Sequence, residues 1–303
     1  MADTEQGNQT SLTEFILLGF GTIPKLQILL FLLFLVIYIV TMAGNILMVV
    51  LVVTDQNLHT PMYFFLGNLS CLETYYTSTV LPRMLSISYA GCVAQVFFLL
   101  FLVGADFSLL TVMAYDRYVA ICQPLHYERV MNSRACVQMA AGAWISGILY
   151  SVLHTGNTFA LTLCGGNKVD QFFCEIPQLL KLTCSDSYLS EVGVLAFTVC
   201  LVLGCFIFII VSYVQIFKSV LRIPSEQSRH KAISTCLPHL TVVSLFVCTG
   251  VFACLKPTSS SPAPLDLVVA VLYSVLPPIM NPIIYSMRNK EMKAALRRLT
   301  GHR

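Results

Sequence analysis

Seven long apolar runs, separated by short polar connections, make up most of the 303-residue chain. They lie near residues 25–53, 58–84, 92–122, 137–160, 191–221, 230–255 and 265–287. Each run is apolar over about 20 residues or more, the length that an α-helix needs to cross a membrane. Strands of a membrane barrel would instead alternate between apolar and polar with period two. The pattern predicts an all-α membrane protein with one domain, residues 1–303, whose residues 25–287 form a seven-transmembrane helix bundle.

The segment after the seventh run has a helical period of its own. Between residues 289 and 299, one face is apolar and the other is basic: Met292, Ala295, Leu296 and Leu299 against Lys293, Arg297 and Arg298. This pattern favours a short amphipathic C-terminal helix on the inner membrane surface, with its basic face toward anionic lipid. A solvated basic tail is the alternative interpretation.

The composition agrees with a membrane protein and excludes common enzyme classes. Hydrophobic residues make up 56% of the chain and charged residues 11%, with a mean hydropathy of +0.77, whereas soluble domains carry about 25% charged residues. No Ser-His-Asp set, His-Glu-x-x-His pattern or glycine-rich phosphate loop is visible. Cys236 and His239 offer two ligands on one run, which are too few for a closed metal site. No repeat relates the two halves, so a secondary transporter is disfavoured.

The positions of the basic residues predict the orientation in the membrane. Lysine and arginine gather around two connections, between runs 3 and 4 and between runs 5 and 6, and in the tail: Arg117, Arg129, Arg134, Lys218, Arg222, Arg229, Lys231, Arg288, Lys290, Lys293, Arg297, Arg298 and Arg303. Because positive residues stay in the cytoplasm, we expect residues 1–24 outside and residues 288–303 as a cytoplasmic tail. Asn8, in the sequon Asn8-Gln9-Thr10, would then be a glycosylation site.

The 12 cysteines divide by position. Eight lie in or beside apolar runs, where cysteine behaves as a small hydrophobic residue. The other four, Cys92, Cys164, Cys174 and Cys184, lie on polar connections or at a helix mouth on the predicted outer side. Four cysteines on one exposed face imply disulfides formed in an oxidising compartment, with three possible connectivities.

Four polar residues fall at similar depth inside the runs: Glu73, Asp106, Asn45 and Asn281. A carboxylate at that depth has to be protonated, paired or bound to a cation, and no lysine or arginine lies at the same depth. Two acids and two amides offer oxygen ligands to a small hard cation. Two protonated acids, hydrogen-bonded to their neighbours, are the alternative.

Two further groups lie near the predicted cytoplasmic face. Asp116, Arg117 and Tyr118 close the third run, where they form either a polar latch or an ordinary membrane boundary. In the seventh run Pro282 removes a backbone hydrogen bond and kinks the helix. The preceding Asn281 is placed to bond the freed backbone, and Tyr285 would swing with the kink.

The sequence segments around these residues resemble those of a known protein family. MAYDRYVAIC (113–122), PMYFFLGNLS (61–70), KAISTCLPHL (231–240) and PPIMNPIIYSMRNK (277–290) resemble, in order and spacing, the odorant receptors of the rhodopsin-like G-protein-coupled family. The resemblance implies switch roles for Asp116, Arg117, Tyr118, Tyr213, Asn281, Pro282 and Tyr285. It also implies a disulfide between Cys92 and Cys174. Cys164 and Cys184 would then pair with each other, although other pairings stay open.

The resemblance further implies a sodium site formed by Glu73, Asp106, Asn45 and Asn281, which stabilises the inactive bundle. The family commonly has aspartate in the second run and glutamate in the third, so the two side-chain lengths are exchanged here. No other cofactor is expected.

A ligand pocket is implied in the outer half of the bundle, between runs 3, 5, 6 and 7. Counting helical turns from Arg117 and Tyr213, and taking the facing positions of runs 6 and 7, predicts a largely apolar wall: Leu99, Leu100, Val103, Phe197, Leu201, Val247, Gly250, Val251, Cys254, Tyr273 and Ser274. The family's Phe-Tyr-Gly-Thr sequence in run 6 reads Phe246-Val247-Cys248-Thr249 here, so a tyrosine hydroxyl is missing. No acid stands where an amine counter-ion would be needed.

The sequence therefore predicts an odorant receptor, not an enzyme. We expect it to bind a small, mostly hydrophobic volatile ligand and to activate a stimulatory, olfactory-type heterotrimeric G protein that raises cyclic AMP. Its other partner would be membrane lipid, with no nucleic acid, and its location the plasma membrane. A non-olfactory chemosensory receptor of the same fold is one alternative. A channel or carrier with Glu73 and Asp106 on its path is the other.

Overall fold

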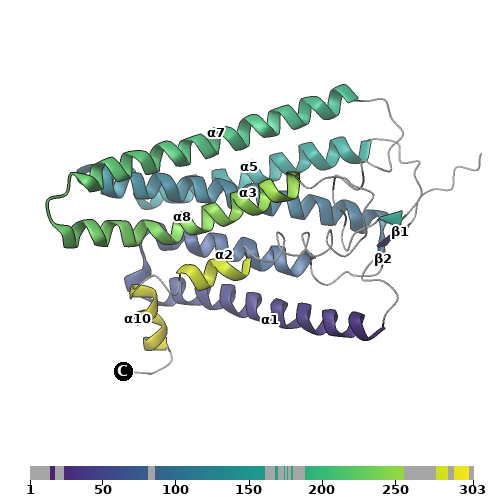
Figure 1. The fold of residues 1–303 in the computed structure, drawn as a ribbon, viewed down its shortest axis with the longest axis horizontal. Helices are drawn as coiled ribbons and strands as arrows, with labels where there is room; N and C mark the ends of the chain where they lie inside the picture. The colour runs from purple at the N-terminus through teal and green to yellow at the C-terminus, as the bar shows by residue number, and fades with distance from the viewer. Residues whose placement is uncertain are drawn as a thin grey trace, which may run out of the picture.

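Long helices lying side by side along one axis form the body of the molecule (Figure 1). The computed structural model describes residues 14–17, 24–80, 86–160, 168–169, 174, 176, 179, 188–255, 278–285 and 290–299. The long helices are α1 (Pro24–Thr54), α2 (Pro61–Val80), α3 (Tyr89–Cys122), α5 (Ser133–Ala160), α7 (Tyr188–Leu221) and α8 (Glu226–Leu255), and residues 278–285 form a further helical segment. Shorter elements are η1 (Gln56–Leu58), η2 (Pro124–His126), α4 (Tyr127–Val130) and α10 (Lys290–Leu299).

Six of the predicted runs coincide with the long helices, residues 278–285 of the seventh run are helical while its residues 265–277 lie outside the described residues, and the fold class is confirmed. Of the residues described, five helical stretches are long and apolar enough to cross a membrane: Phe31–Thr54, Tyr89–Cys122, Ser133–Ala160, Ala196–Leu221 and Glu226–Cys248. Helix α2 is less apolar because it turns polar side chains such as Glu73 and Thr77 into the interior, where both are buried.

Local signals fix several helix ends. Ser88 caps α3 by accepting a hydrogen bond from the Gly91 amide at 3.1 Å, which satisfies one of the free N–H groups of the first turn. Proline opens α1 and α2 at positions 24 and 61, where its missing N–H costs nothing. Ser225 precedes α8, and its carbonyl accepts from the Arg229 amide at 3.0 Å.

Helices α3 and α5 pack most closely, because small residues line their contact. A Cβ added at Gly147 would lie 2.6 Å from the Phe101 carbonyl oxygen and 2.9 Å from the Ala105 Cβ. The Ser108 and Ser146 hydroxyls bond across the contact at 2.9 Å, and Ser151 donates to the Phe97 carbonyl at 2.5 Å. Glycine at position 147 therefore sets the separation of the two helices.

A small sheet lies at the end of the bundle that also holds the Cys92–Cys174 disulfide, and we call this the disulfide end. Strand β1 (Glu14–Leu17) pairs antiparallel with β2 (Ser86–Ser88) and parallel with β3 (Lys168–Val169). This sheet is an addition to the predicted helices. Strands of two to four residues are too short to produce a readable alternation of apolar and polar positions.

Helix α10 runs across the opposite end of the bundle, beside the start of α2 (Figure 1). Met292 and Ala295 are buried, so its predicted apolar face packs against the protein. The Tyr63 hydroxyl donates to Glu291 Oε2 at 2.7 Å, and Arg298 binds Asp55 Oδ2 through Nε at 2.8 Å and Nη2 at 2.6 Å. These bonds to Arg298 hold the pKa of the Asp55 carboxyl below its usual value.

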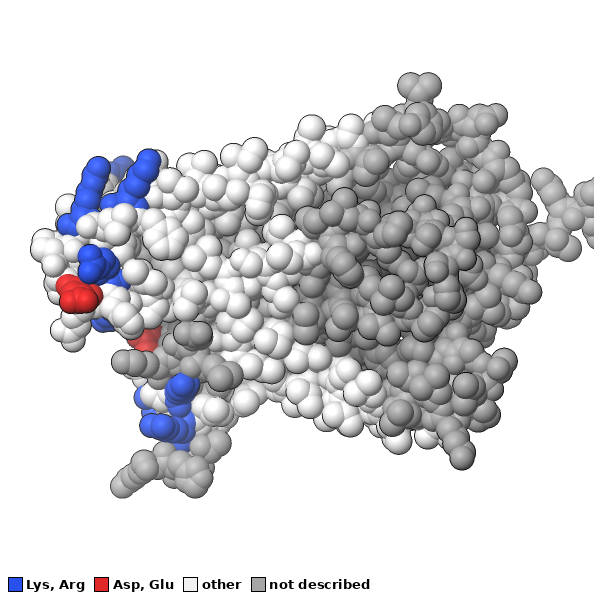
Figure 2. All heavy atoms as spheres, in the orientation of Figure 1, with Lys and Arg blue, Asp and Glu red and all other residues white. Residues whose placement is uncertain are grey.

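The surface divides into a charged end and an uncharged body. Lysine and arginine gather at the end formed by η2, α4, the 222–225 turn and α10, which we call the basic end (Figure 2). Over the described middle of the bundle, no charged side chain is seen on the face shown. Exposed apolar side chains cover α1 and α7 instead, which is the surface that a lipid environment requires.

Candidate functional site

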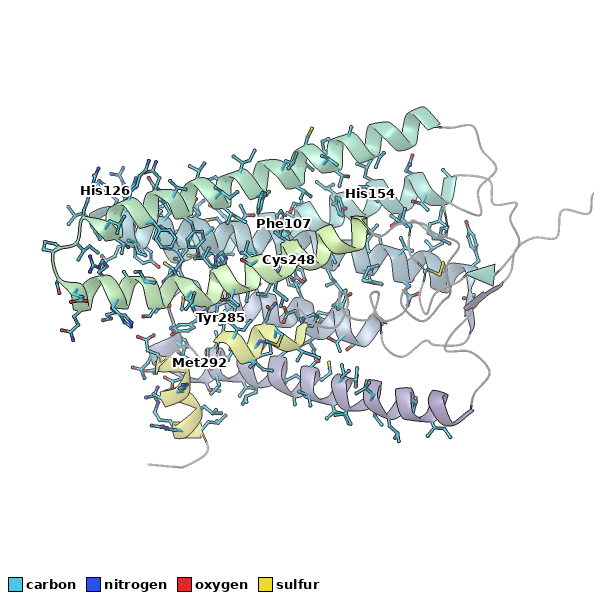
Figure 3. All side chains as sticks on the ribbon, in the orientation of Figure 1. Phe107, His126, His154, Cys248, Tyr285 and Met292 are labelled. Carbon is cyan, nitrogen blue, oxygen red and sulfur yellow. A yellow bond between two sulfur atoms is a disulfide. The ribbon has the colours of Figure 1, made fainter. Side chains whose placement is uncertain are left out.

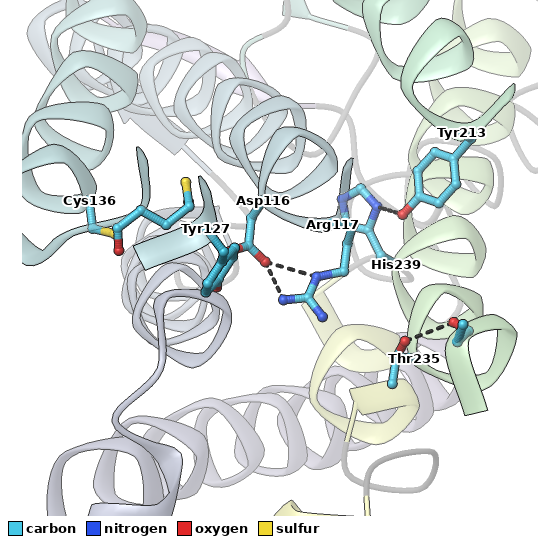
Figure 4. Close-up of polar contacts among 9 residues, drawn as sticks. Asp116, Arg117, Tyr127, Cys136, Tyr213, Thr235 and His239 are labelled. Carbon is cyan, nitrogen blue, oxygen red and sulfur yellow. Dashed lines mark hydrogen bonds and ion pairs between the residues drawn. The ribbon is translucent and has the colours of Figure 1, made fainter. Parts of the chain in front are cut away.

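A buried carboxylate at the basic end holds two partners (Figure 4). Asp116 is fully buried on α3 and accepts from Arg117 through Nε, at 2.8 Å, and through Nη2. Its other oxygen accepts from the Tyr127 hydroxyl on α4 at 2.8 Å. A buried charge of this kind needs its partners satisfied, so the three residues form one unit, which we call the latch.

Tyr127 was missed by the sequence analysis. It lies 11 residues after Asp116, on a short helix that no apolar run predicts. Burial and the neighbouring Asp116 carboxylate raise the pKa of Tyr127, so the phenol keeps its proton and remains a donor. Tyr127 thereby joins the connection between α3 and α5 to Asp116.

A histidine on α8 bonds to two other helices, and Figure 4 shows its bond to Tyr213. His239 is buried, and its Nε2 lies 3.0 Å from the Leu110 carbonyl of α3. Because a carbonyl can only accept, Nε2 carries the proton, and Nδ1 accepts from the Tyr213 hydroxyl of α7 at 2.6 Å. His239 had been weighed only as a weak metal ligand; here it joins α8 to α3 and α7, and Tyr213 lies at this junction.

The four predicted cation ligands lie in the interior, where hydrogen bonds join α1 and α2 to the helical segment 278–285. Asn281 donates to Glu73 Oε1, and Glu73 interacts electrostatically with Asp106. Within the described residues, four of their buried oxygens have no hydrogen-bond partner: Asn45 Oδ1, Glu73 Oε2, Asp106 Oδ1 and Asn281 Oδ1. An excess of unpaired acceptors fits a hard cation or protons on the acids. The described residues contain no group of three or more His, Cys, Asp or Glu side chains that could hold a metal ion together.

The backbone freed by Pro282 is satisfied from a neighbouring helix. Proline leaves the carbonyl four residues earlier without its usual donor, and that carbonyl, of Pro278, accepts from Asn45 Nδ2 at 3.2 Å. Asn281 was expected to do this, but its amide is used by Glu73. Gly44 leaves room for the Pro282 ring, since a Cβ there would lie 3.2 Å from Pro282 Cγ. Tyr285, one turn further, is buried.

The disulfide between Cys92 and Cys174 joins the start of α3 to the loop before α7, which is the pairing implied by the resemblance. A small apolar cluster forms around it from Val96, Leu179 and Ile176. The other predicted outer cysteines, Cys164 and Cys184, lie outside the described residues, as does Asn8.

The predicted ligand wall is described in part. On α3, Leu99, Leu100 and Val103 are half-buried, and their place on the ligand wall stays a prediction. Val247 on α8 is half-buried as well. The side chains of Val251 and Cys254 and the surroundings of Gly250 are not described, and Tyr273 and Ser274 lie outside the described residues.

Two predicted wall residues do not face the interior. Phe197 and Leu201 on α7 are 52% and 47% exposed, so their assignment to the pocket is wrong. They were placed by steps of four residues from Tyr213. At 3.6 residues per turn, each such step rotates by about 40°, and the three or four steps move these positions to the outside of the helix.

An aromatic pair lies beside the acid pair. Phe107, next to Asp106, stacks on Phe246 of α8 with ring centroids 5.5 Å apart. Figure 3 places Phe107 and Cys248 at the middle of the bundle, away from both ends. This contact links α3 to α8 at the level where the family's tyrosine is replaced by Val247.

Comparison with known proteins decides the family. A sequence profile of the olfactory receptor family matches residues 34–302. The chain belongs to the olfactory receptor family. It is 50% identical to human olfactory receptor 14I1 over 300 residues, 96% of each chain. It is also 50% identical to human olfactory receptor 14A16 over 297 residues, 95% of this chain and 96% of the other.

The architecture agrees with this assignment. Squid rhodopsin matches the structure with a TM-score of 0.71 over 93% of this chain and 87% of that one, at 18% identity. The receptor therefore has the seven-helix fold of a G-protein-coupled receptor. The resemblance read from the four sequence motifs is confirmed, and the protein is a signalling receptor rather than an enzyme.

Proposed function

We propose that this receptor binds a small, largely hydrophobic, volatile odorant in the outer half of the bundle and activates a stimulatory heterotrimeric G protein, which raises cyclic AMP. In this proposal the receptor crosses the plasma membrane with the disulfide end outside and the basic end in the cytoplasm. The excess of lysine and arginine at the basic end supports that orientation.

Leu125 is the observation that carries the proposal of a protein partner. It lies in η2, directly after α3, and is 95% exposed at the basic end. An apolar side chain held so far into water makes little contact within the described part of the receptor, so its apolar surface is available to a partner. Burying a leucine in a partner pocket contributes about 1.5–3 kcal/mol.

Basic residues around Leu125 define the charge of that partner surface. Exposed cations lie on α4, α5 and the ends of α7 and α8: Arg129, Arg134, Lys218, Arg222 and Lys231. They favour an acidic surface and would speed its docking. The latch lies beneath Leu125, because Tyr127 connects η2 and α4 to Asp116. Docking at Leu125 is thereby coupled to Arg117.

A wall with few polar groups supports the ligand class. Leu99, Leu100, Val103 and Val247 provide apolar surface, and burial of such surface contributes about 25 cal/mol per Å². Such a pocket selects neutral, hydrophobic molecules over charged ones, since a buried charge would have no partner there.

Sodium is part of the proposal as a regulator. Each of Asn45, Glu73, Asp106 and Asn281 contributes a buried oxygen that lacks a hydrogen-bond partner among the described residues, so the donor set fits the ion. Bound sodium would supply the positive charge that the two acids lack. Helix α10 would in turn meet anionic lipid through its exposed cations, Lys293 among them.

Nucleotide exchange on a purified stimulatory G protein tests the proposal. The receptor in lipid nanodiscs should accelerate exchange when an odorant found by screening is added, and Leu125→Ala should weaken G-protein coupling about tenfold or more. Val53→Ala, at an exposed apolar position on α1, is the matched control and should leave exchange unchanged. Odorant-independent solute flux in vesicles, with no exchange, would support a channel or carrier instead.

A further inference from the structure

Gln95 places a side-chain amide beneath the disulfide end of α3. It is 5% exposed and lies one helical turn after Cys92. The Cys174 backbone N–H, on the other side of the disulfide, donates to Gln95 Oε1 at 3.0 Å. Because a backbone N–H can only donate, this bond identifies the oxygen of the amide and fixes which way it points.

The nitrogen of the same amide is left over. Gln95 Nε2 is buried and has no hydrogen-bond partner within the described residues. A buried donor without an acceptor costs about 1–3 kcal/mol, and such groups are rare in folded proteins. The bond to Cys174 prevents the amide from turning away, so the donor is held in place for an acceptor that comes from elsewhere.

The surroundings define that acceptor. Gln95 and Leu99 are four residues apart on α3 and share a face, so the amide stands one turn above the apolar wall. The nearby cluster of Val96, Leu179 and the disulfide is apolar. An acceptor reaching Nε2 therefore belongs to a molecule that is hydrophobic apart from one oxygen.

A second unpaired group lies at the same height on α5 and serves as a comparison. Thr155 is buried, and its hydroxyl lacks a partner among the described residues. Its height follows from the pairing of the helices, since Phe159 meets Tyr89 and Ser151 meets Phe97 on either side of it.

We propose that Gln95 is the specificity-determining hydrogen-bond donor of the odorant site, and that Nε2 binds the oxygen of a neutral ketone, aldehyde or ester. This proposal rests on the proposed receptor function and names its ligand class. Hydrocarbons of the same shape fill the apolar wall but leave the amide unpaired, so the receptor discriminates against them. Ligand preference is thus set from α3 in place of the tyrosine hydroxyl that α8 lacks.

Matched ligands and matched variants test the assignment. Methyl ketones from hexanone to decanone are compared with the alkenes in which a methylene group replaces the carbonyl oxygen, by odorant-driven nucleotide exchange. One hydrogen bond predicts that ketones act at concentrations about tenfold or more below those of the alkenes. Gln95→Met should raise the effective ketone concentration about tenfold and leave the alkenes unchanged. Thr155→Val should keep the ketone preference.

Several outcomes overturn the proposal. They are equal potency of ketones and alkenes on the unmodified receptor, a ketone preference that survives in Gln95→Met, or its loss in Thr155→Val. Gln95→Asn, one methylene shorter, replaces Met if that variant misses the cell surface, and an undiminished ketone preference there counts against Gln95. If no ketone, aldehyde or ester acts while basal exchange on the G protein persists, the ligand class is wrong and the receptor function stands. Absence of any exchange overturns the receptor function itself.

Discussion

At the scale of single residues, the latch explains why two neighbouring charges can share one buried place. Asp116 and Arg117 are adjacent on α3, where side chains do not face each other squarely, yet Arg117 folds back onto the carboxylate through two nitrogens. Tyr127 takes the second oxygen. Arg117 is thereby held by an acid that it can leave only when another partner replaces it.

Replacing Arg117 by alanine should abolish signalling and leave surface expression mostly intact, because the arginine acts at the G-protein face. Odorant-driven cyclic AMP and antibody staining of intact cells measure the two properties. Lys293→Ala, which removes an exposed cation on α10 outside the proposed docking surface, controls for charge alone. Full cyclic AMP output from Arg117→Ala would refute its role as the switch.

The acid pair predicts a sodium response. Sodium should lower basal activity, because a ligand that binds the inactive state better shifts the population toward it. Glu73→Gln and Asp106→Asn should each remove that response. Basal exchange is measured in sodium and in choline at equal ionic strength, so that screening stays constant. The same response in all three proteins would leave the pair as protonated structural acids.

At the scale of elements, the first six apolar runs predicted the long helices within a few residues, because about 20 apolar residues in succession have few other solutions. What failed was geometry that depends on rotation or on short segments. Phe197 and Leu201 were misplaced by accumulated helical drift, and the small sheet gives no pattern. Tyr127 and the Asn45–Pro278 bond could not be predicted, since no spacing in the sequence brings these residues together.

The α3–α5 contact predicts a local test of packing. Gly147→Ala should destabilise the receptor by about 1–3 kcal/mol, because the new Cβ meets the Phe101 carbonyl and overpacking has that cost. Gly142→Ala should be neutral or slightly stabilising, because a Cβ added there, on the same helix, meets no described atom within 4 Å. The melting temperatures of the purified variants measure the difference. Equal loss in both would mean that the contact with Phe101 does not decide the cost.

The bond between Asp55 and Arg298 predicts how the docking of α10 depends on pH. Because the pKa of Asp55 is lowered in the folded protein, its contribution is fully present above the ordinary aspartate pKa of about 4. The contribution is lost as pH falls through the lowered folded value. The distance between spin labels on α10 and α1 should therefore lengthen only in that acidic range, and Asp55→Asn should remove this response. An acid-induced lengthening of equal size in Asp55→Asn would assign the effect to another group.

At the scale of the whole molecule, the Cys92–Cys174 disulfide connects the start of α3 to the loop before α7. Cys92→Ser and Cys174→Ser should each prevent the receptor from reaching the cell surface, and the double variant should be no worse than either single one. Shared dependence on one bond makes the losses non-additive. Surface staining of the three variants measures this, with Cys248→Ser, an exposed free cysteine on α8, as the control. Additive losses would argue for different partners.

The fold and the family could be read from the sequence, whereas the candidate site was readable only in part. Motif residues such as Asp116, Glu73 and Asn281 were found because they are polar within apolar runs. Gln95 was passed over and His239 was considered only as a metal ligand, because each is one polar residue among many and only its partners reveal its role. Long-range hydrogen bonds are a property of the assembled bundle.

The two hydrogen bonds of His239 have a consequence for the basal activity of the receptor. Any motion that carries α8 away from α3 and α7 breaks both bonds at once. At about 1 kcal/mol each, they disfavour the open form about thirtyfold, so only a few per cent of unoccupied receptors would signal on account of this imidazole alone. A molecule that prefers the open form by less than that factor leaves the closed form in the majority and excites the receptor only in part. Such a molecule would compete for the pocket with odorants that excite the receptor fully.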